Sequence, residues 1–275
     1  MSAEFFHNSQ PPDSAGDQGK VAEIFRLYSI LASAFPMDAQ SGVGGKLFYT
    51  GSIGNLSRGS DWMYAANIAG AASLGASADP AALRQAMRDG VIDFLVNSLD
   101  EALRILKNEI RKRQAISVGV AAEPYLLVEQ MLIRGVLPDL LPHSSSAADA
   151  GLDRRQAEKF MAQGSREIAI FERETSAASG KFISWSITPS AQAPHKAASW
   201  LPRLDACAQA ILPPEDVIRR RWLRLAPRYL GRRMQRQHGV FLTAEESLRF
   251  EAEVRQLIGR HTNEGEEAVG LVISG

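Results

Sequence analysis

The sequence of 275 residues contains a single cysteine, Cys207, and five scattered histidines. One cysteine cannot form an intramolecular disulfide, so we expect a protein of the reducing, cytoplasmic compartment. The cysteine and the histidines show none of the paired spacings, such as CxxC or HExxH, that indicate zinc. We therefore predict no metal site, and we interpret Cys207, which lies among alanines, as a small apolar residue of a helix.

The sequence also lacks net charge and long apolar runs. Lys plus Arg and Asp plus Glu both number 31, so no overall field attracts nucleic acid or an anionic membrane. No stretch approaches the roughly 18 apolar residues that cross a bilayer. Residues 1–20 are polar and lack the segments of a signal peptide. We expect them to be a disordered leader before an amphipathic helix over residues 21–35, and we expect neither a membrane nor nucleic acid as a partner.

Apolar, β-prone runs alternate with helical patterns through the middle of the chain. The expected strands are 46–50, 91–96, 115–120 and 138–141, and the expected helices are 61–72, 80–90, 98–113 and 125–134. Pro80 and Gly90 bound one helix, and Ser98 with Glu101 forms a capping box at the start of the next. Strands and helices joined by short connections are typical of right-handed βαβ units. We predict an α/β fold, a doubly wound (Rossmann-like), mostly parallel sheet with additional N- and C-terminal helices.

The loop over residues 51–60 follows the first expected strand and is rich in glycine and serine. Small residues at such a turn let backbone amides approach a phosphate, and the next helix adds a favourable dipole. The spacing of Gly51, Gly54 and Gly59 does not form a regular G-x-G-x-x-G motif, and no P-loop lysine follows. The pattern leaves two interpretations open, a flexible strand–helix loop and a phosphate site.

Six sequence blocks occur in the order found in one known family. They are GKLFYTGSIGNLSRG (45–59), IAGA (68–71), ADP (78–80), SLDEAL (98–103), SVGV (117–120) and IRGVLPD (133–139). In this order the blocks resemble the Rossmann-like, NAD-binding core of the urocanase (urocanate hydratase) family, over about a hundred residues. The resemblance implies a tightly held NAD, whose nicotinamide adds to the imidazole of urocanate before water adds.

The resemblance also implies a set of cofactor-binding positions, and it identifies no catalytic residue. These positions are Gly51, Ser52, Gly54, Asn55, Gly59, Ser77, Asp79, Gly119, Ser144 and Ser145. Several contact positions depart from the family pattern. Ser52 replaces a loop glycine, Arg58 lengthens the loop, Ser77 replaces an acidic residue, Glu123 replaces an uncharged residue, and His143 replaces the aspartate of D-Q-T-S.

The family's G-L-P-A-R-I-C-W and D-Y-G-N-N stretches have no counterpart in this sequence. We therefore expect a urocanase-like domain that binds a small ligand or nucleotide, or NAD weakly, and is not a complete urocanate hydratase. One alternative is an NAD-dependent lyase or hydratase of altered specificity. The other is a non-catalytic interaction protein or a subunit of a split enzyme.

The rest of the chain is expected to be a helical C-terminal extension over residues 191–275, packed on a core of residues 21–190. Residues 151–173 and 200–212 show helical patterns, and residues 181–188 alternate as a strand, which we expect to be the sixth of the sheet. The tail 268–275 is β-prone and is expected at a sheet edge or a dimer interface. Three histidines in polar contexts are expected to be exposed, namely His195, His238 and His261.

Residues 218–238 are unusually rich in arginine, with Trp222 and Tyr229 interleaved. The arginines are Arg219, Arg220, Arg221, Arg224, Arg228, Arg232, Arg233 and Arg236. They can form a solvated face that pairs with the acidic helix expected over residues 243–259. Alternatively, Arg219–Arg236 is a docking surface for an anionic ligand, a protein partner or a second copy of the chain. The neutral total charge disfavours nucleic acid.

Overall fold

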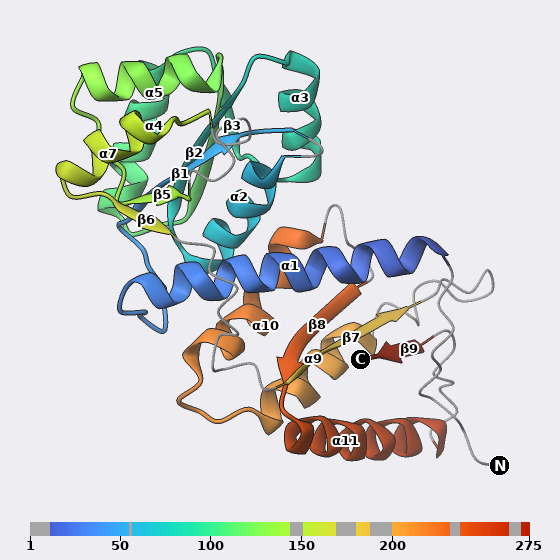
Figure 1. Cartoon of the computed structure of the whole chain (residues 1–275). Helices are drawn as coiled ribbons and strands as arrows, with labels where there is room; N and C mark the ends of the chain where they lie inside the picture. Colours follow the sequence, from blue (N-terminus) through green and yellow to red (C-terminus); the bar gives the residue numbers. More distant parts are fainter. Residues whose placement is uncertain are drawn as a thin grey trace. The chain divides into compact units, whose positions relative to one another are not determined.

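The computed structural model describes residues 12–54, 57–143, 151–168, 180–187, 200–231, 237–263 and 271–275. The chain divides into two compact units, which share the helix α1 (Pro12–Ala34) (Figure 1). One unit spans Arg26–Phe171, and the other combines Met1–Phe25 with Glu172–Gly275. This division falls before the boundary expected at residue 190. We call the two units the parallel-sheet unit and the C-terminal unit.

The parallel-sheet unit contains a six-stranded sheet in the order β3-β4-β2-β1-β5-β6, with every neighbouring pair parallel. The strands are β1 (Leu47–Ser52), β2 (Ala72–Ser77), β3 (Phe94–Val96), β4 (Ile116–Ala121), β5 (Leu140–Pro142) and β6 (Arg166–Ile168). The helices that follow α1 are α2 (Arg58–Ala69), α3 (Pro80–Asp89), α4 (Leu99–Arg111), α5 (Pro124–Ile133) and α7 (Arg154–Ala162). The predicted α/β fold, a Rossmann-like doubly wound sheet, is confirmed.

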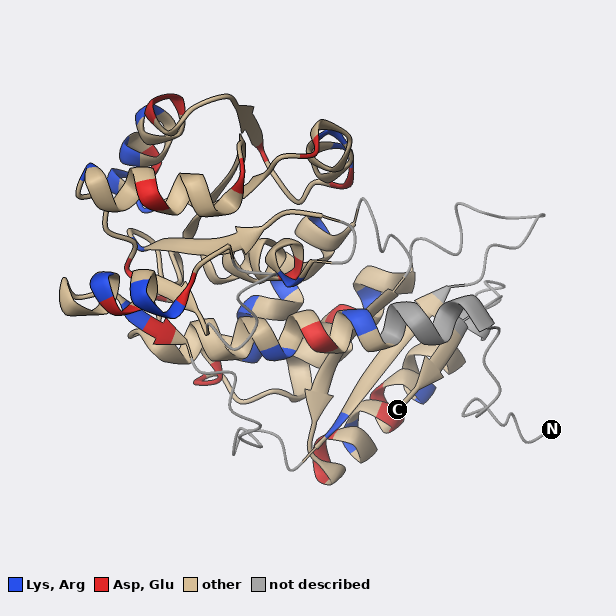
Figure 2. Ribbon diagram, turned by 45° about the horizontal axis from the view of Figure 1, so that its top comes forward, with Lys and Arg blue, Asp and Glu red and all other residues tan. Residues whose placement is uncertain are grey.

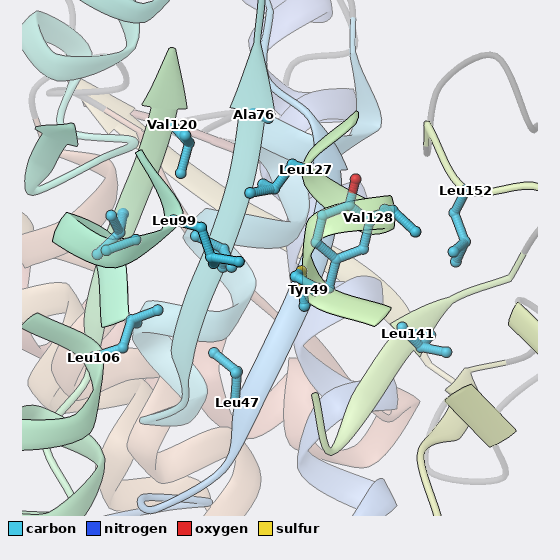
Figure 3. Close-up of a cluster of buried hydrophobic side chains, with 14 of the residues drawn as sticks. Leu47, Tyr49, Ala76, Leu99, Leu106, Val120, Leu127, Val128, Leu141 and Leu152 are labelled. Atoms are coloured by element: carbon cyan, nitrogen blue, oxygen red, sulfur yellow. The ribbon is translucent and has the colours of Figure 1, made fainter. Parts of the chain in front are cut away.

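Helices cover both faces of this sheet. On one face, α4, α5 and α7 bury a cluster that includes Leu47 and Tyr49 of β1, Leu106 of α4 and Leu127 of α5 (Figure 3). The opposite face packs against α2 and α3, where Phe48 meets Trp62 edge to face with 5.2 Å between ring centroids. Adjacent side chains of β1 therefore point to opposite faces of the sheet, because successive residues of a β-strand alternate between its two faces.

Local sequence signals set the ends of several helices as predicted. Asp79 accepts a hydrogen bond from the amide of Ala81 at the start of α3, and Gly90 ends that helix in the left-handed conformation. Ser98 accepts a bond from the amide of Glu101 at the start of α4. The Glu101 carboxylate, however, accepts from the amide of Asn97 rather than from that of Ser98. In a standard capping box this carboxylate would accept from the amide of the N-cap residue, Ser98, whereas here it accepts from the residue before it.

The C-terminal unit is built around a separate antiparallel sheet in the order β8-β7-β9. Its elements are β7 (Lys181–Ile187), α9 (Trp200–Ile211), α10 (Val217–Leu230), β8 (Gln237–Leu242), α11 (Ala244–Asn263) and β9 (Leu271–Ser274). The expectation that 181–188 adds the sixth strand of the parallel sheet is wrong, because β6 takes that place and β7 pairs with β8 and β9. The β-prone tail forms the edge strand β9, as predicted.

Two other expectations are corrected. The helix expected over 151–173 ends at Ala162, because Gly164 adopts a positive φ of 113° and the chain then enters β6. The leader expected over 1–20 is shorter, because residues 12–20 are the first turns of α1; residues 1–11 lie outside the described part. Among the described helices, none has the length and apolar character needed to cross a membrane.

Candidate functional site

The candidate site lies at the carboxyl edge of the parallel sheet. The chain passes from β1 to β2 on one side, whereas β5 pairs with β1 on its other side (Figure 1). In an open α/β sheet, ligands bind outside the carboxyl ends of the strands at such a reversal of strand order. The turn from β1 to α2 and the residue after β5, His143, therefore flank the expected position of a ligand.

The β1–α2 turn brings the start of α2 directly against the end of β1. A Cβ atom at Gly59 would lie 2.0 Å from the carbonyl oxygen of Ser52, so only glycine fits there. Gly51 adopts a positive φ of 90°, which also favours glycine. The amide of Ile53 donates to the carbonyl of Ala76 at 2.8 Å and ties the turn to β2. The turn therefore retains the close strand–helix packing that dinucleotide-binding folds use.

The polar groups of this turn bond to one another. The hydroxyls of Ser57 and Ser60 both donate to the carbonyl oxygen of Gly54, each at 3.0 Å. The amide of Gly54 in turn donates to Ser60 Oγ at 3.3 Å. Ser57 is the N-cap residue of α2, but it makes no side-chain capping bond. Asp61, only 4% exposed, places a carboxylate in the first turn of α2, where it complements the positive end of the helix dipole.

The end of β2 carries a serine, and the nearest carboxylate in sequence belongs to Asp79. Ser77 is buried, and its hydroxyl accepts a bond from the amide of Asp79 at 3.3 Å. The Asp79 carboxylate caps α3 through a 2.7 Å bond from the amide of Ala81. Dinucleotide-binding folds place at this point an acidic residue that accepts from ribose hydroxyls. At the end of β2 the acid of that pattern is therefore replaced by Ser77, and Asp79, two residues later, uses one carboxylate oxygen to cap α3.

His143 is oriented at the carboxyl end of β5. Its Nδ1 lies 3.1 Å from Oε1 of Glu167 in β6. The other oxygen of Glu167, Oε2, lies 3.5 Å from Nη1 of Arg154. Within the described part of the chain, Nε2 of His143 makes no hydrogen bond. An imidazole that is oriented through one nitrogen can donate or accept a proton through the other.

The remaining predicted positions are spread over three places. Gly51, Ser52, Gly54 and Gly59 lie at the end of β1 and on the turn after it, Ser77 is the last residue of β2, and Asp79 follows that strand. Gly119 lies in the middle of β4, where an added Cβ would be 2.8 Å from Ile92 and 3.2 Å from Ile53 and Leu83. These apolar side chains cover Gly119. Asn55, Ser144 and Ser145 lie outside the described residues. The cofactor-binding role of all these positions stays a prediction.

A tyrosine beneath this edge is held neutral. Tyr49, in the middle of β1, is fully buried, and its hydroxyl lies 3.5 Å from the carbonyl oxygen of Pro124. Burial raises the pKa of Tyr49 well above its ordinary value.

No group of three or more His, Cys, Asp or Glu side chains that could hold a metal ion occurs in the part of the chain that the structure describes.

The arginine-rich segment is partly used inside the C-terminal unit. Arg219 forms a two-bond pair with Glu246 of α11 at 2.6 and 2.8 Å, as the interpretation of paired helices predicts. Arg220 donates to the carbonyls at the end of α9. Arg221, expected on one exposed face with Arg224 and Arg228, is instead buried, because the buried face of α10 is broad.

Arg224 and Arg228 are the exposed arginines of α10. In both units, charged residues of either sign lie mainly on the helices, and the strands are mostly uncharged (Figure 2). Arg232, Arg233 and Arg236 lie outside the described residues. A docking role for Arg219–Arg236 stays a prediction, and within the described part of the segment it concerns Arg224 and Arg228.

Sequence reasoning missed one polar cluster in the C-terminal unit. His238, expected to be exposed, lies in β8 with its side chain 13% exposed. Its Nδ1 is 2.8 Å from Oδ2 of Asp205, and the indole nitrogen of Trp185 donates to Oδ1 of the same carboxylate at 2.9 Å. The cavity beside His238 has a volume of about 10 Å³, room for no more than about one water molecule. The cluster therefore supports the packing of this unit and lines no ligand pocket.

Comparison with protein families places this chain beside a known domain. The model described as the Urocanase Rossmann-like domain matches residues 16–153, about half of the sequence. The match contains the strands from β1 to β5 and ends before α7. It confirms the resemblance that the ordered sequence blocks indicate, and it leaves the C-terminal unit unmatched from Glu172 onward.

Proposed function

The chain belongs to the urocanase family, and we propose that its Rossmann-like unit binds a small ligand between the ends of β1 and β5. It holds NAD weakly and is not a complete urocanate hydratase. One observation carries the proposal: the strand–helix packing at Gly59 is retained, while Ser57, Ser60 and Asp79 direct their polar atoms at the protein's own backbone. The scaffold of a nucleotide site is thus kept without the contacts that bind NAD tightly.

The ligand expected at this edge is small and polar. His143 offers it Nε2, while Nδ1 stays directed at Glu167. The amides at the start of α2 favour a partial negative charge, but the hydroxyls of Ser57 and Ser60 donate to the carbonyl oxygen of Gly54 and not to a ligand. A neutral ligand, or one with a single negative charge, therefore fits better than a pyrophosphate.

The test is a search for bound nucleotide in freshly purified, full-length protein. The protein is denatured, the supernatant is analysed by mass spectrometry, and a second sample is titrated with NAD in a calorimeter. We expect less than stoichiometric nucleotide and weak binding. Stoichiometric NAD would contradict the proposal and would favour the alternative of an NAD-dependent lyase, in which His143, oriented by Glu167, would be the candidate proton-transfer residue.

A variant that restores the missing carboxylate sharpens this test. Ser77→Glu places an acid at the end of β2, where ribose hydroxyls donate in dinucleotide-binding folds. Because hydrogen bonds to a charged group contribute about 1.5–3 kcal/mol, we expect NAD to bind roughly tenfold or more tightly to this variant. Ser77→Gln, of similar size and without charge, is the matched control. Equal NAD affinity in the two variants would show that the cofactor does not occupy this edge.

A further inference from the structure

A groove lies at the amino edge of the parallel sheet, opposite the candidate ligand site. It has a volume of about 390 Å³ and lies between α4 and the segment that connects α5 to β5. Leu103, Leu106 and Ile110 of α4 line one side, and Val136 and Leu137 line the other. This volume is in the range of clefts that hold ligands or anchor side chains, about 300–1,000 Å³. The groove is therefore large enough to receive several apolar side chains.

The apolar surface continues beyond the groove onto α5. This helix buries Leu127, Val128 and Met131 in the core, and its outer side carries exposed apolar residues on either side of the exposed Gln130. Ile133 is 84% exposed, Leu126 is 49% exposed, and they lie seven residues apart on one face of the helix. A surface helix normally carries polar residues on its outer side. Large apolar side chains exposed next to a groove are a feature of interaction sites.

Basic side chains border the groove. Lys107 and Arg134 are among its lining residues, and Arg104 and Arg111 are exposed at positions three before and four after Lys107 on α4. Asp100, the nearby carboxylate, is already paired with Arg134. Within the described part of the chain, Arg104 and Lys107 make no hydrogen bond or ion pair. Asp100 also attracts Arg104 and Lys107 electrostatically, but one carboxylate faces three basic side chains, so the rim of the groove carries an excess of positive charge.

We propose that this groove docks an acidic amphipathic helix of a different protein. The separation of Leu103 and Ile110 along α4 is about 10 Å, so the groove matches two turns of a helix that inserts apolar residues and places carboxylates near Lys107 and Arg104. A membrane is disfavoured because the apolar side chains of the groove line a concave surface. A second copy could insert α3 through the exposed Met87 or α11 through the exposed Leu248. The first is disfavoured because Arg84 and Arg88 lie beside Met87 and would meet the basic rim. The second is disfavoured because Glu245, beside Leu248, is already paired with Arg249.

The experiment measures the anisotropy of a fluorescein-labelled helical peptide titrated with the full chain. The peptide has about five turns, with leucines at i, i+3, i+4 and i+7 spacing and glutamates on either side. We expect micromolar binding. Lys107→Glu reverses a rim charge and Leu137→Asp places a charge in the groove, and each should raise the Kd about tenfold. Arg84→Glu, an equivalent charge reversal on exposed α3, is the control and should leave the Kd unchanged.

Folding of each variant is checked by circular dichroism, and Lys107→Glu, at an exposed position, tests the proposal even where Leu137→Asp fails to fold. Four results would overturn it: no binding of the acidic peptide, equal binding of a peptide with lysine in place of glutamate, an unchanged Kd for Lys107→Glu, or preferential binding to phosphatidylserine vesicles. Self-association in the ultracentrifuge that Leu137→Asp abolishes would identify a second copy as the occupant and would also overturn it. None of these results affects the proposed ligand site, which lies at the other edge of the sheet.

Discussion

The two units of this protein achieve close packing with a different balance of glycines and aromatic rings. In the parallel-sheet unit, elements approach where a side chain is missing: Gly59 lets α2 contact the end of β1, and Gly75 lies where a Cβ would be 2.7–2.9 Å from Thr50, Met63 and Gly51. In the C-terminal unit, large side chains meet, with Phe25 packing on Trp222 at 4.9 Å and on Phe241 at 5.3 Å between ring centroids. Both means occur in each unit, since Phe48 packs on Trp62 in the parallel-sheet unit and a Cβ at Gly180 of the C-terminal unit would lie 2.1 Å from the carbonyl oxygen of Leu242. The cluster of several packed rings, however, belongs to the C-terminal unit.

The difference extends to polar groups. In the C-terminal unit the buried rings are anchored by hydrogen bonds, from the Trp185 indole to Asp205 and from the Trp222 indole to the carbonyl of Gly239 at 2.7 Å. At the β1–α2 turn, hydroxyls bond to the backbone within a few residues. Local bonds of this kind depend on a short stretch of sequence, whereas the anchoring bonds join residues that are distant in the chain. The two units should therefore respond differently to substitution.

The largest effect is expected from Gly59→Ala. The added methyl group would lie 2.0 Å from a backbone oxygen of Ser52, which no side-chain rotation can relieve. We expect a loss of about 3 kcal/mol in the free energy of unfolding, measured by urea denaturation. Hydrogen exchange should show the loss of protection in β1 and β2. Gly54→Ala is the matched control, because its Cβ would lie 3.7 Å from Ser57 Oγ, an ordinary contact.

Equal stability of the Gly59 and Gly54 variants would contradict the comparison between the two units. It would show that α2 can move away from β1 at little cost in free energy. In that case the turn would be a flexible loop, which is the other interpretation that its glycine spacing leaves open. The same result would remove the main structural support for a retained nucleotide scaffold at this edge.

A somewhat smaller effect is expected from Asp205→Ala in the C-terminal unit. The substitution leaves the Trp185 indole nitrogen and His238 Nδ1 without their shared acceptor in a mostly buried position. Unsatisfied buried polar groups cost about 1–3 kcal/mol each, and we expect a loss of about 2–3 kcal/mol in thermal and urea denaturation. Asp205→Asn retains one acceptor oxygen and should lose about half as much. An effect no larger than that of the exposed control Glu215→Ala would contradict the anchoring role.

Much of the parallel-sheet unit could be predicted because its signals are local. Pro80 and Gly90 delimit α3, and the alternation of strands and helices specifies the doubly wound sheet. The strand β6 was missed because its residues follow a charged helical pattern without a clear period, and Gly164 is the signal that could have ended that helix. The strand β8 was missed because the arginine tract before it dominates the composition.

The sequence predicts where the candidate site lies, but it predicts few of the hydrogen bonds that its side chains make. The sequence places a glycine-rich turn after β1, but it cannot show that Ser57 and Ser60 bond to Gly54 or that Asp79 caps α3. In the same way, no local pattern links His238 to Asp205, which are 33 residues apart. Contacts of this kind depend on how distant segments meet, and hydroxyl directions depend on which backbone groups remain unpaired.

The smallest effect is expected from Glu246→Gln, and it tests whether the C-terminal unit also depends on charge. Burial alone would raise the pKa of Glu246, but hydrogen bonds from Arg219 and from the Thr243 amide outweigh it, so the pKa lies below its ordinary value of 4.5. A carboxyl group whose pKa is lowered by folding stabilises the folded state above its unfolded pKa. This stabilisation is lost as the pH falls through the folded pKa.

We therefore expect the free energy of unfolding of the wild type to exceed that of Glu246→Gln by about 1–2 kcal/mol near neutral pH. The difference should shrink below about pH 4.5. Urea denaturation between about pH 3 and pH 7 measures it, with Glu245→Gln, an exposed member of the Glu245–Arg249 pair, as the control. A difference that stays constant across this range would show that Glu246 acts through the shape of its capping bonds with Thr243 rather than through its charge.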